Sequence, residues 1–230
     1  DLVTGVQTCA LPISAPIFPG GSLRGAMEWI AQLATDADFE FYLAYGGTIN
    51  ANNRIAIILN TMNLQYERDV DITHVVSRSI VRTSIIDPYS AIEEDEMNQQ
   101  IGAAWIGESG TWDLILVFTG TDRDLTGTVV GRANAIGSVC NGAHSNCWAW
   151  ADFNNNFSSA TDLCAHELGH LWNGEHCTCS DPRSTMNPNI TGINRFGVNA
   201  NDTADTSIPA YRSTRSCLTP AASSVAPPND

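Results

Sequence analysis

The stretch HELGHLWNGEH, residues 166–176, contains three of the five histidines of the chain. His166 and His170 are four residues apart, so on an α-helix both side chains project from one face, one turn apart. Two imidazoles placed in this way can share one metal ion. Asn173 and Gly174 favour a left-handed backbone, and this turn predicts that His176 reaches the same ion from the other side. Three protein ligands on a tetrahedral zinc ion leave one position for water, which is typical of catalytic rather than structural zinc sites.

Glu167 follows the first predicted ligand directly, which places its side chain about 100° around the helix from His166. We therefore predict that Glu167 faces the metal-bound water and acts as the general base in peptide hydrolysis. The alternative is an amphipathic helix that carries exposed histidines, and a bare HExxH motif does not exclude it. The turn and His176 weigh against that alternative.

The spacing of the three histidines resembles the metzincin zinc endopeptidases, whose second hallmark is a methionine in a tight turn beneath the metal. Met186 in SDPRSTMNP, residues 180–188, stands in a turn-forming context and matches this methionine. Within the metzincins, the chain is similar to the reprolysin or adamalysin group, in particular to its bacterial relatives. The resemblance extends from about residue 27 to 217, and the segments that carry it are YGGTINA, NLQYERDVDI, VGRANAIGSVC and DLCAHELGHLW.

Three positions depart from the patterns of these families. Asn173 stands where the family has glycine, and Gly174 follows one place later. Cys177 follows the third ligand, where animal members often have aspartate. Pro188 stands two residues after Met186, where astacins and serralysins carry a tyrosine, so this turn offers no tyrosine ligand or oxyanion donor.

The resemblance implies an α/β metzincin catalytic domain. Such a domain has a twisted, mostly parallel five-stranded sheet with an antiparallel edge strand, long helices, an active-site helix and a small irregular C-terminal subdomain that contains the Met-turn. Apolar periodicity independently predicts alternating strands and helices. The predicted strands are residues 27–34, 70–81, 112–118, 129–136 and 147–153. Helices are predicted over 37–45, from Thr48, from Asp87–Pro88, from Ser158 or Ser159, and from Ser207.

Composition restricts the partners of the protein. The chain has 25 acidic and 11 basic residues, all of the latter arginine, and a net charge of −14. This charge argues against nucleic acid and anionic membranes, and no apolar run approaches the length of a membrane span. We expect a soluble, secreted, monomeric protein. His74 lies on the apolar face of its strand and is predicted to be a core residue rather than a ligand.

The domain boundaries follow from local composition. Residues 1–14 resemble the translation of a sequencing-library adapter, and we interpret them as an artefactual, non-native segment. Residues 15–26 read as a linker or irregular segment, 27–217 as the catalytic domain, and 218–230 as a disordered tail or linker.

Without Cys9, an even set of cysteines remains, which fits disulfides and an oxidising compartment. The six disulfide candidates are Cys140, Cys147, Cys164, Cys177, Cys179 and Cys217. The resemblance implies that Cys140 pairs with Cys217. We expect that Cys147 and Cys164 pair with Cys177 and Cys179, although the sequence alone does not choose among the possible pairings of six cysteines. A cysteine-based metal site is the weaker alternative, because the histidines already account for the metal.

The resemblance also implies further binding residues. In metzincins the antiparallel edge strand binds the substrate as an added strand. The matching substrate contacts are Gly131, Arg132, Ala133 and Asn134, although a polar edge strand that resists aggregation is an equal alternative. Asn189 and Ile190 are expected to line the pocket for the residue after the cut bond. Reprolysins often carry a structural calcium ion, and Glu28, Asp113 and Cys217 match its ligand positions. Pro220 stands where the family has an asparagine ligand, and simple solvation of both carboxylates is the alternative.

These observations predict a secreted zinc endopeptidase with one catalytic zinc ion and a protein or peptide substrate. One alternative is a catalytically silent zinc-containing binding or adhesion module, whose mark would be loss of the glutamate that is present here as Glu167. Another is a zinc hydrolase that acts on a different bond. The predicted edge strand favours an extended peptide over that second alternative.

Overall fold

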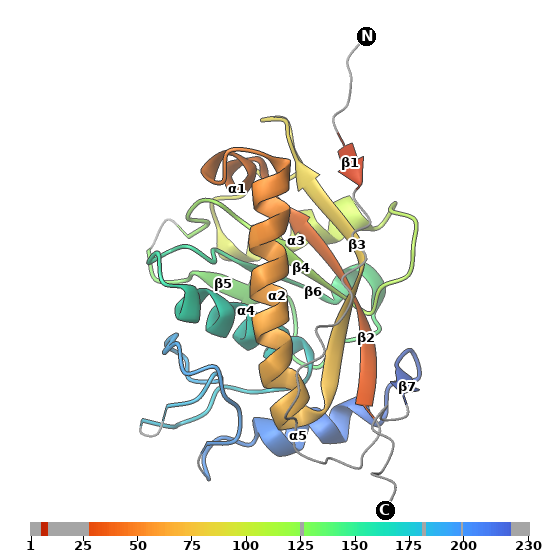
Figure 1. The fold of residues 1–230 in the computed structure, drawn as a ribbon, viewed down its shortest axis with the longest axis vertical. Helices are drawn as coiled ribbons and strands as arrows, with labels where there is room; N and C mark the ends of the chain where they lie inside the picture. The colour runs from red at the N-terminus through yellow and green to blue at the C-terminus, as the bar shows by residue number, and fades with distance from the viewer. Residues whose placement is uncertain (1–5, 9–27, 125–126, 181–182, 199, 222–230) are drawn as a thin grey trace, which may run out of the picture.

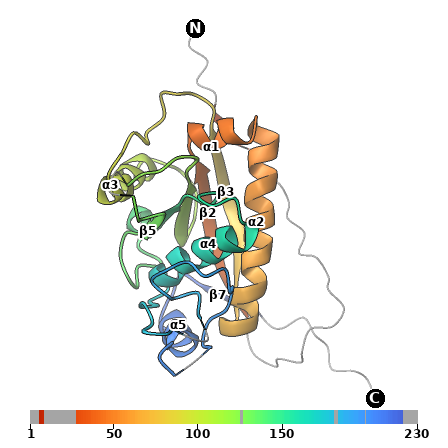
Figure 2. The same ribbon diagram turned by 90° about the vertical axis from the view of Figure 1, so that its left-hand side faces the viewer.

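The structure is a computed structural model, and it describes residues 6–8, 28–124, 127–180, 183–198 and 200–221. The chain forms one mixed sheet between two layers of helices (Figures 1 and 2). The predicted linker or irregular segment, residues 15–26, lies outside the described residues, as do residues 222–230 of the predicted tail.

Five strands make up the main sheet, in the order β3-β2-β4-β6-β5. Four of them run parallel and β5 runs antiparallel to β6 at the edge, which confirms the predicted α/β fold. Their bounds are β2 Glu28–Ala37, β3 Ile72–Arg82, β4 Leu114–Phe118, β5 Gly131–Ala133 and β6 Asn146–Ala149. Two short antiparallel strands extend this sheet, because β1 (Val6–Thr8) pairs with β3 and β7 (Thr219–Ala221) pairs with the start of β2.

The helices connect and cover these strands. Their bounds are α1 Phe39–Ala44, α2 Thr48–Val70, α3 Glu94–Trp105, η1 Gly142–His144, α4 Phe157–Leu171 and α5 Ala204–Arg212. The long helix α2 and the active-site helix α4 pack on one face of the sheet, whereas α3 packs on the other (Figure 2).

The central strand β4 shows why the sheet is covered on both faces. All five of its residues are apolar and fully buried. Leu114, Leu116 and Phe118 point to the side of α2 and α4, while Ile115 and Val117 point to the side of α3. This alternation gives the molecule two apolar layers, as expected for a buried, mostly parallel sheet.

The helix starts predicted at Asp87 and at Ser158 or Ser159 are wrong. Asp87 does not begin a helix, because its carboxylate accepts hydrogen bonds from the backbone N–H groups of Phe39 and Tyr89, both at 2.8 Å. The helix starts later, with the acidic run in its first turn. The active-site helix is capped by Asn156, whose side chain accepts the N–H of Ser159 at 3.2 Å. In both cases the backbone N–H groups donate to a short polar side chain, and a periodicity of apolar residues does not reveal such hydrogen bonds.

Other elements differ from prediction mainly in length. The edge strand is three residues long instead of the predicted eight. Helix α5 starts at Ala204 rather than at the predicted Ser207, and Pro209 lies in its interior. Within the predicted non-native segment, Val6–Thr8 forms a backbone ladder with the outer edge of β3. The interpretation of residues 1–14 as artefactual stays a prediction.

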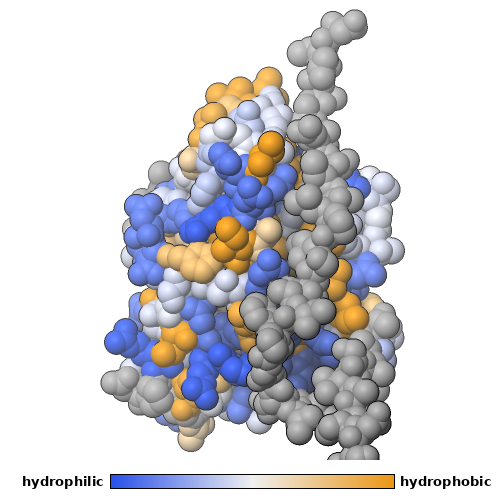
Figure 3. Space-filling model, viewed as in Figure 1, coloured by the Kyte–Doolittle hydropathy of each residue, from blue (hydrophilic) through white to orange (hydrophobic). Residues whose placement is uncertain are grey.

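Among the residues that are coloured in Figure 3, hydrophobic and hydrophilic ones are interspersed. Single exposed apolar residues such as Ile49 and Ile57 lie on the outer side of α2. None of the described helices is both long and apolar enough to cross a membrane.

His74 is a core residue, as predicted. Its side chain is 4% exposed on β3, where the Trp172 Nε1–H donates to Nε2 at 3.0 Å and Nδ1 lies 3.1 Å from Asn63 Oδ1. Burial lowers the pKa of His74 to about 3. The imidazole is therefore neutral in the folded protein at neutral pH.

This burial predicts a pH-dependent stability. The pKa of histidine in the unfolded chain is about 6.5. Between that value and about 3, the unfolded chain binds a proton that the folded chain excludes, so the unfolding free energy falls as the pH falls, by up to about 1.4 kcal/mol per pH unit. Urea unfolding of zinc-free protein at about pH 4 and about pH 7 should show a smaller pH effect for His74→Gln than for the wild type. Equal pH effects would contradict the assignment.

Candidate metal centre and catalytic cleft

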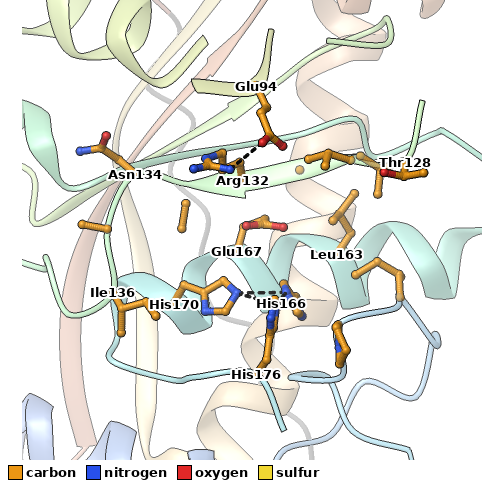
Figure 4. A pocket seen from close by; sticks show the side chains of 17 residues that line it. Glu94, Thr128, Arg132, Asn134, Ile136, Leu163, His166, Glu167, His170 and His176 are labelled. Atoms are coloured by element: carbon orange, nitrogen blue, oxygen red, sulfur yellow. Dashed lines mark hydrogen bonds and ion pairs between the residues drawn. The ribbon is translucent and has the colours of Figure 1, made fainter. Parts of the chain in front are cut away.

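The three predicted ligands meet at one point. Helix α4 carries His166 and His170, and the chain then turns back and brings His176 beside them (Figure 4). The Nε2 atom of His166 lies 3.1 Å from that of His170 and 3.1 Å from that of His176. The remaining Nε2–Nε2 distance, between His170 and His176, is 3.2 Å. All three ring nitrogens therefore converge from two directions on a common centre.

The turn between the helix and the third ligand has two requirements, which two different residues meet. Asn173 adopts the left-handed conformation, with φ of 72°. Gly174 is needed for a different reason, because a Cβ atom there would lie 2.9 Å from the carbonyl oxygen of Gly169. The Gly174 N–H donates to that same oxygen at 2.8 Å and closes the end of the helix. The shift of glycine by one place is thus compatible with the turn.

Backbone carbonyl groups fix the orientation of the two helical ligands. Nδ1 of His166 lies 2.6 Å from the carbonyl oxygen of Thr185, and Nδ1 of His170 lies 2.7 Å from that of Gly174. A carbonyl oxygen can only accept, so each Nδ1 carries the proton and each Nε2 lone pair points to the shared centre.

Burial also favours the form of these imidazoles that binds metal. It lowers the pKa of His166 to about 3 and that of His170 to about 4. The neighbouring imidazoles act in the same direction as burial, whereas the hydrogen bonds to the carbonyl groups raise both pKa values. Burial lowers the pKa of His176 as well. Neutral imidazole is the ligand form, so the cluster can bind a metal at neutral pH without first losing protons.

The geometry fits zinc. A point about 2.0–2.1 Å from all three Nε2 atoms exists, and at that distance the N–metal–N angles are about 100°, close to tetrahedral. A set of three nitrogens suits zinc better than calcium or magnesium, which prefer oxygen ligands. All three histidines line the cleft, as in sites where zinc takes part in catalysis.

The cleft above this centre has a volume of about 490 Å³. One wall is the edge strand β5, and the floor is α4 with the three histidines (Figure 4). Glu167 lies between them, pointing from α4 towards β5, and is 4% exposed. Burial raises its pKa to about 8, although the backbone N–H of Ala133 and the charge of Arg132 act in the opposite direction. A carboxyl group with such a pKa can both take up and release a proton near neutral pH.

Glycine is required at position 131 to leave room for this carboxylate. A Cβ atom on Gly131 would lie 2.9 Å from Glu167 Oε1 and 2.9 Å from Leu163 Cδ1. Both separations are shorter than ordinary van der Waals contact. The strand can therefore approach the glutamate this closely only because it has no side chain there.

The four predicted substrate contacts divide into two pairs by the direction of their peptide groups. The N–H of Asn134 donates to Asn146 at 2.9 Å and the carbonyl oxygen of Val130 accepts from Trp150 at 2.7 Å. Peptide groups alternate in direction along a strand. The peptide group of Arg132 therefore also faces β6, whereas those of Gly131 and Ala133 face the open edge over the cleft. The Arg132 side chain forms ion pairs with Glu94 at 2.8 Å and with Asp95 at 2.6 Å.

Met186 lies where the resemblance predicts. It is fully buried against α4, and a Cβ on Gly169 would lie 2.7 Å from its sulfur atom. The carbonyl oxygen of Met186 accepts the N–H of Cys177 at 2.8 Å, which ties the turn to the residue after His176. Farther along this segment, Ile190 lines the cleft with Pro188, whereas Asn189 lines only an adjoining hollow.

The structure contains one of the three disulfides expected from the sequence. The structure joins Cys140 to Cys217, as the resemblance implies. The other predicted links are wrong, because Cys177 pairs with Cys179 and leaves Cys147 and Cys164 as free thiols. Cys147 on β6 and Cys164 on α4 are fully buried between sheet and helix, away from the loop after His176. Burial raises the pKa of both thiols.

The predicted calcium ligands are not assembled as a set. Asp113 Oδ2 accepts the backbone N–H of Gln32 at 2.7 Å, and its carboxylate lies beside the sulfur atoms of the Cys140–Cys217 disulfide. Glu28 accepts a hydrogen bond from Thr73 and is not part of that group. The geometry of the described residues gives calcium no support.

Two residues of the site were missed in the sequence. Thr185 supplies the carbonyl partner of His166, and Asp162 binds the Thr185 hydroxyl. Asp162 precedes His166 by four residues, so a carboxylate one helical turn before the first ligand was the available signal.

Comparison with known proteins agrees with this geometry. The family model Reprolysin_5, metallo-peptidase family M12, matches residues 28–217. No curated protein matches the chain. Similar solved structures include archaemetzincin (amzA) from Methanopyrus kandleri, with a TM-score of 0.51 and 14% identity over 79% of this chain and 94% of that one.

A second similar structure is a chain from a structure described as a chaperone–substrate complex, with a TM-score of 0.59 and 13% identity. The match covers 80% of this chain but only 37% of that chain. At these identities the two structures show the fold alone. The family model, in contrast, spans most of the chain and includes all three histidines and Glu167, and the protein therefore belongs to metallo-peptidase family M12.

Proposed function

We propose that this peptidase is a secreted endopeptidase that cuts within extended polypeptides and uses Glu167 as its general base. The observation that carries the proposal is the position of Glu167 between the three converging Nε2 atoms and the open edge of β5 (Figure 4). A buried carboxylate, three converging imidazoles and an open strand edge around one cleft support the proposal.

The substrate would bind as an additional strand. The peptide groups of Gly131 and Ala133 face the cleft, and apart from the Ala133 N–H, which is hydrogen-bonded to Glu167, they can form hydrogen bonds with an extended chain irrespective of its side chains. Pro188 and Ile190 also line the cleft, so an apolar side chain next to the cut bond would contact them. Backbone binding along an edge suits the interior of a chain rather than a terminus.

The chemistry follows from the positions of the side chains. His166, His170 and His176 would hold a zinc ion, which when bound would act as a Lewis acid and lower the pKa of a water molecule to about 7. Glu167 accepts the proton of the attacking water and delivers it to the nitrogen of the leaving amine. Its burial holds this proton in the cleft between the two steps, because a charged carboxylate is less stable there than in water.

The alternatives are less consistent with the site. A silent binding module would not need a buried carboxylate beside the metal. Here the strand makes room for that carboxylate, because a side chain at position 131 would displace Glu167. A zinc hydrolase for a different bond would not need the open backbone edge of β5. Secretion is supported by the Cys140–Cys217 disulfide, because such bonds persist in oxidising compartments.

Cleavage of a peptide mixture would test the function. We expect the zinc-loaded chain to cut an unfolded protein at internal bonds, with the products identified by mass spectrometry. A zinc chelator should stop the cleavage and added zinc should restore it. Stoichiometric zinc without any cleavage would refute the peptidase proposal, and release of single terminal residues only would refute the endopeptidase assignment.

Substitution of Gly131 tests the fit between β5 and Glu167. In Gly131→Ala the added methyl group would displace Glu167 or push the strand away, so we expect kcat/KM to fall by about tenfold to a hundredfold. Zinc affinity should stay unchanged, since no ligand is touched. The matched control is Gly107→Ala, where a Cβ meets nothing within 4 Å. Unchanged activity in Gly131→Ala would show that the close contact is unimportant.

A further inference from the structure

Asp162 is a buried carboxylate that serves neither as a metal ligand nor as the proposed base. It lies on α4 one turn before His166 and is fully buried. Five hydrogen bonds end on its two oxygen atoms, and all come from N–H and O–H groups of the segment around and after the Met-turn. One stretch of chain, residues 185–194, therefore supplies all five hydrogen bonds to the carboxylate.

The first group of these bonds leads to the zinc ligand. Asp162 Oδ1 accepts the hydroxyl of Thr185 at 2.6 Å, while the carbonyl oxygen of Thr185 accepts Nδ1–H of His166 at 2.6 Å. Thr185 thus bridges two successive turns of α4. Its hydroxyl oxygen also accepts from Gln65 Nε2 at 2.8 Å and from the N–H of Arg195 at 2.9 Å, which uses its full hydrogen-bonding capacity.

The second group leads to the wall of the cleft. Asp162 Oδ2 accepts the N–H of Gly192 at 2.7 Å, together with the N–H and hydroxyl of Thr191 at 3.2 and 3.3 Å. Asp162 Oδ1 also accepts the N–H of Asn194 at 3.1 Å. These residues directly follow Ile190, which lines the cleft. One carboxylate therefore holds both the partner of His166 and the support of the cleft wall.

We propose that Asp162 is a positioning residue that couples the orientation of His166 to the position of the cleft wall at Ile190. Its effect on the metal is independent of the reaction, whereas its effect on substrate preference rests on the proposed endopeptidase function. Asp162 does not touch the metal or the substrate. It acts through Thr185 on one side and through residues 191–194 on the other.

A second buried carboxylate provides a matched control. Asp202 is 4% exposed and holds the same turn, since it accepts hydrogen bonds from the Ser184 hydroxyl, from the N–H of Gly197 at 2.8 Å and from that of Ala204 at 3.1 Å. None of these partners is the hydrogen-bond partner of His166 or His170, and none lines the cleft. Loss of Asp202 should therefore destabilise the turn without the specific effects expected for Asp162.

The experiment compares Asp162→Asn with Asp202→Asn in the full chain. Zinc affinity is measured by competition with a chelator, and the thermal midpoint is measured on the zinc-free protein. We expect both variants to lose stability, but only Asp162→Asn to bind zinc about tenfold to a hundredfold more weakly. Its cobalt-substituted form should also have an altered visible spectrum. Equal zinc affinities in the two variants would overturn the proposal.

Thr185 provides variants with a smaller perturbation. Thr185→Val keeps the shape and the carbonyl group but loses the hydroxyl, and Thr185→Ser restores the hydroxyl. We expect the valine variant to weaken zinc binding and the serine variant to recover it. In ¹⁵N spectra of the zinc-free protein, the Nδ1–H signal of His166 should shift in Thr185→Val and return in Thr185→Ser. Identical signals in all three proteins would contradict the coupling.

Peptides that differ only in the residue after the cut bond test the second half of the proposal. In Asp162→Asn the preference among these peptides should change, mainly through KM, because the wall at Ile190 is no longer held. Asp202→Asn should keep the wild-type order of preference. An unchanged order in Asp162→Asn would refute the link to the wall. If the wild type cuts no peptide, the endopeptidase proposal fails, while the zinc and NMR measurements still decide the role of Asp162.

Discussion

Replacement of Glu167 by glutamine should leave zinc bound and lower kcat by about a hundredfold to ten-thousandfold. Glutamine has nearly the same shape and fits below Gly131, but it cannot accept a proton from water or deliver one to the leaving nitrogen. The histidine ligands are untouched, because the Nδ1 partners of His166 and His170 are the carbonyl groups of Thr185 and Gly174. Zinc content and peptide cleavage, measured on the same sample, separate loss of the base from loss of the metal.

The pH profile gives a second measure of the same residue. Burial raises the pKa of Glu167 to about 8 in the metal-free cleft, and the charge of a bound zinc ion lowers it. The base must be ionised at the start of the reaction. In the zinc-loaded protein, kcat/KM should therefore increase with pH up to the pKa that Glu167 has beside the bound ion, and then level off. The glutamine variant should lose this acidic limb.

Glu175→Gln is a suitable control, because Glu175 is exposed and does not line the cleft. It should keep both the wild-type rate and the pH profile. Wild-type activity in Glu167→Gln would assign the proton transfer to another group.

The sequence predicts the metal centre well because its geometry is local. Two histidines one turn apart on a helix and a third after a short turn have few possible arrangements, and the structure brings all three Nε2 atoms within 3.2 Å of one another. The mixed sheet is predictable for a similar reason. Apolar runs such as Leu114–Phe118 are too apolar for any position other than the centre of a covered sheet.

The parts that were missed depend on contacts between distant segments. Asp162 and Thr185 are 23 residues apart, and nothing in either local pattern indicates that they share a hydrogen bond. The free thiols show the same limitation. Cys147 and Cys164 belong to a strand and a helix that pack on each other in the core, so their separation from Cys177 and Cys179 follows from tertiary packing, not from spacing.

Loss of one histidine ligand is the second large effect. In His166→Ala only two ring nitrogens remain and the Thr185 carbonyl loses its donor, so we expect zinc affinity to fall by more than about a hundredfold, beyond the effect of changing a residue that only orients a ligand. Peptide cleavage should fall with zinc occupancy, and high zinc concentrations should restore little of it because the tetrahedral geometry is lost.

Thermal unfolding distinguishes this result from a simple folding defect. Zinc that binds only the folded state raises the midpoint of the wild type as its concentration increases, by an amount that depends on the ratio of free zinc to Kd. The midpoint of His166→Ala should hardly respond over the same range. His144→Ala is the matched control, because His144 is exposed in η1 and is not part of the three-histidine cluster. A zinc-dependent midpoint in His166→Ala equal to that of His144→Ala would show that His166 is not a ligand, and the assignment of the metal centre would then be wrong.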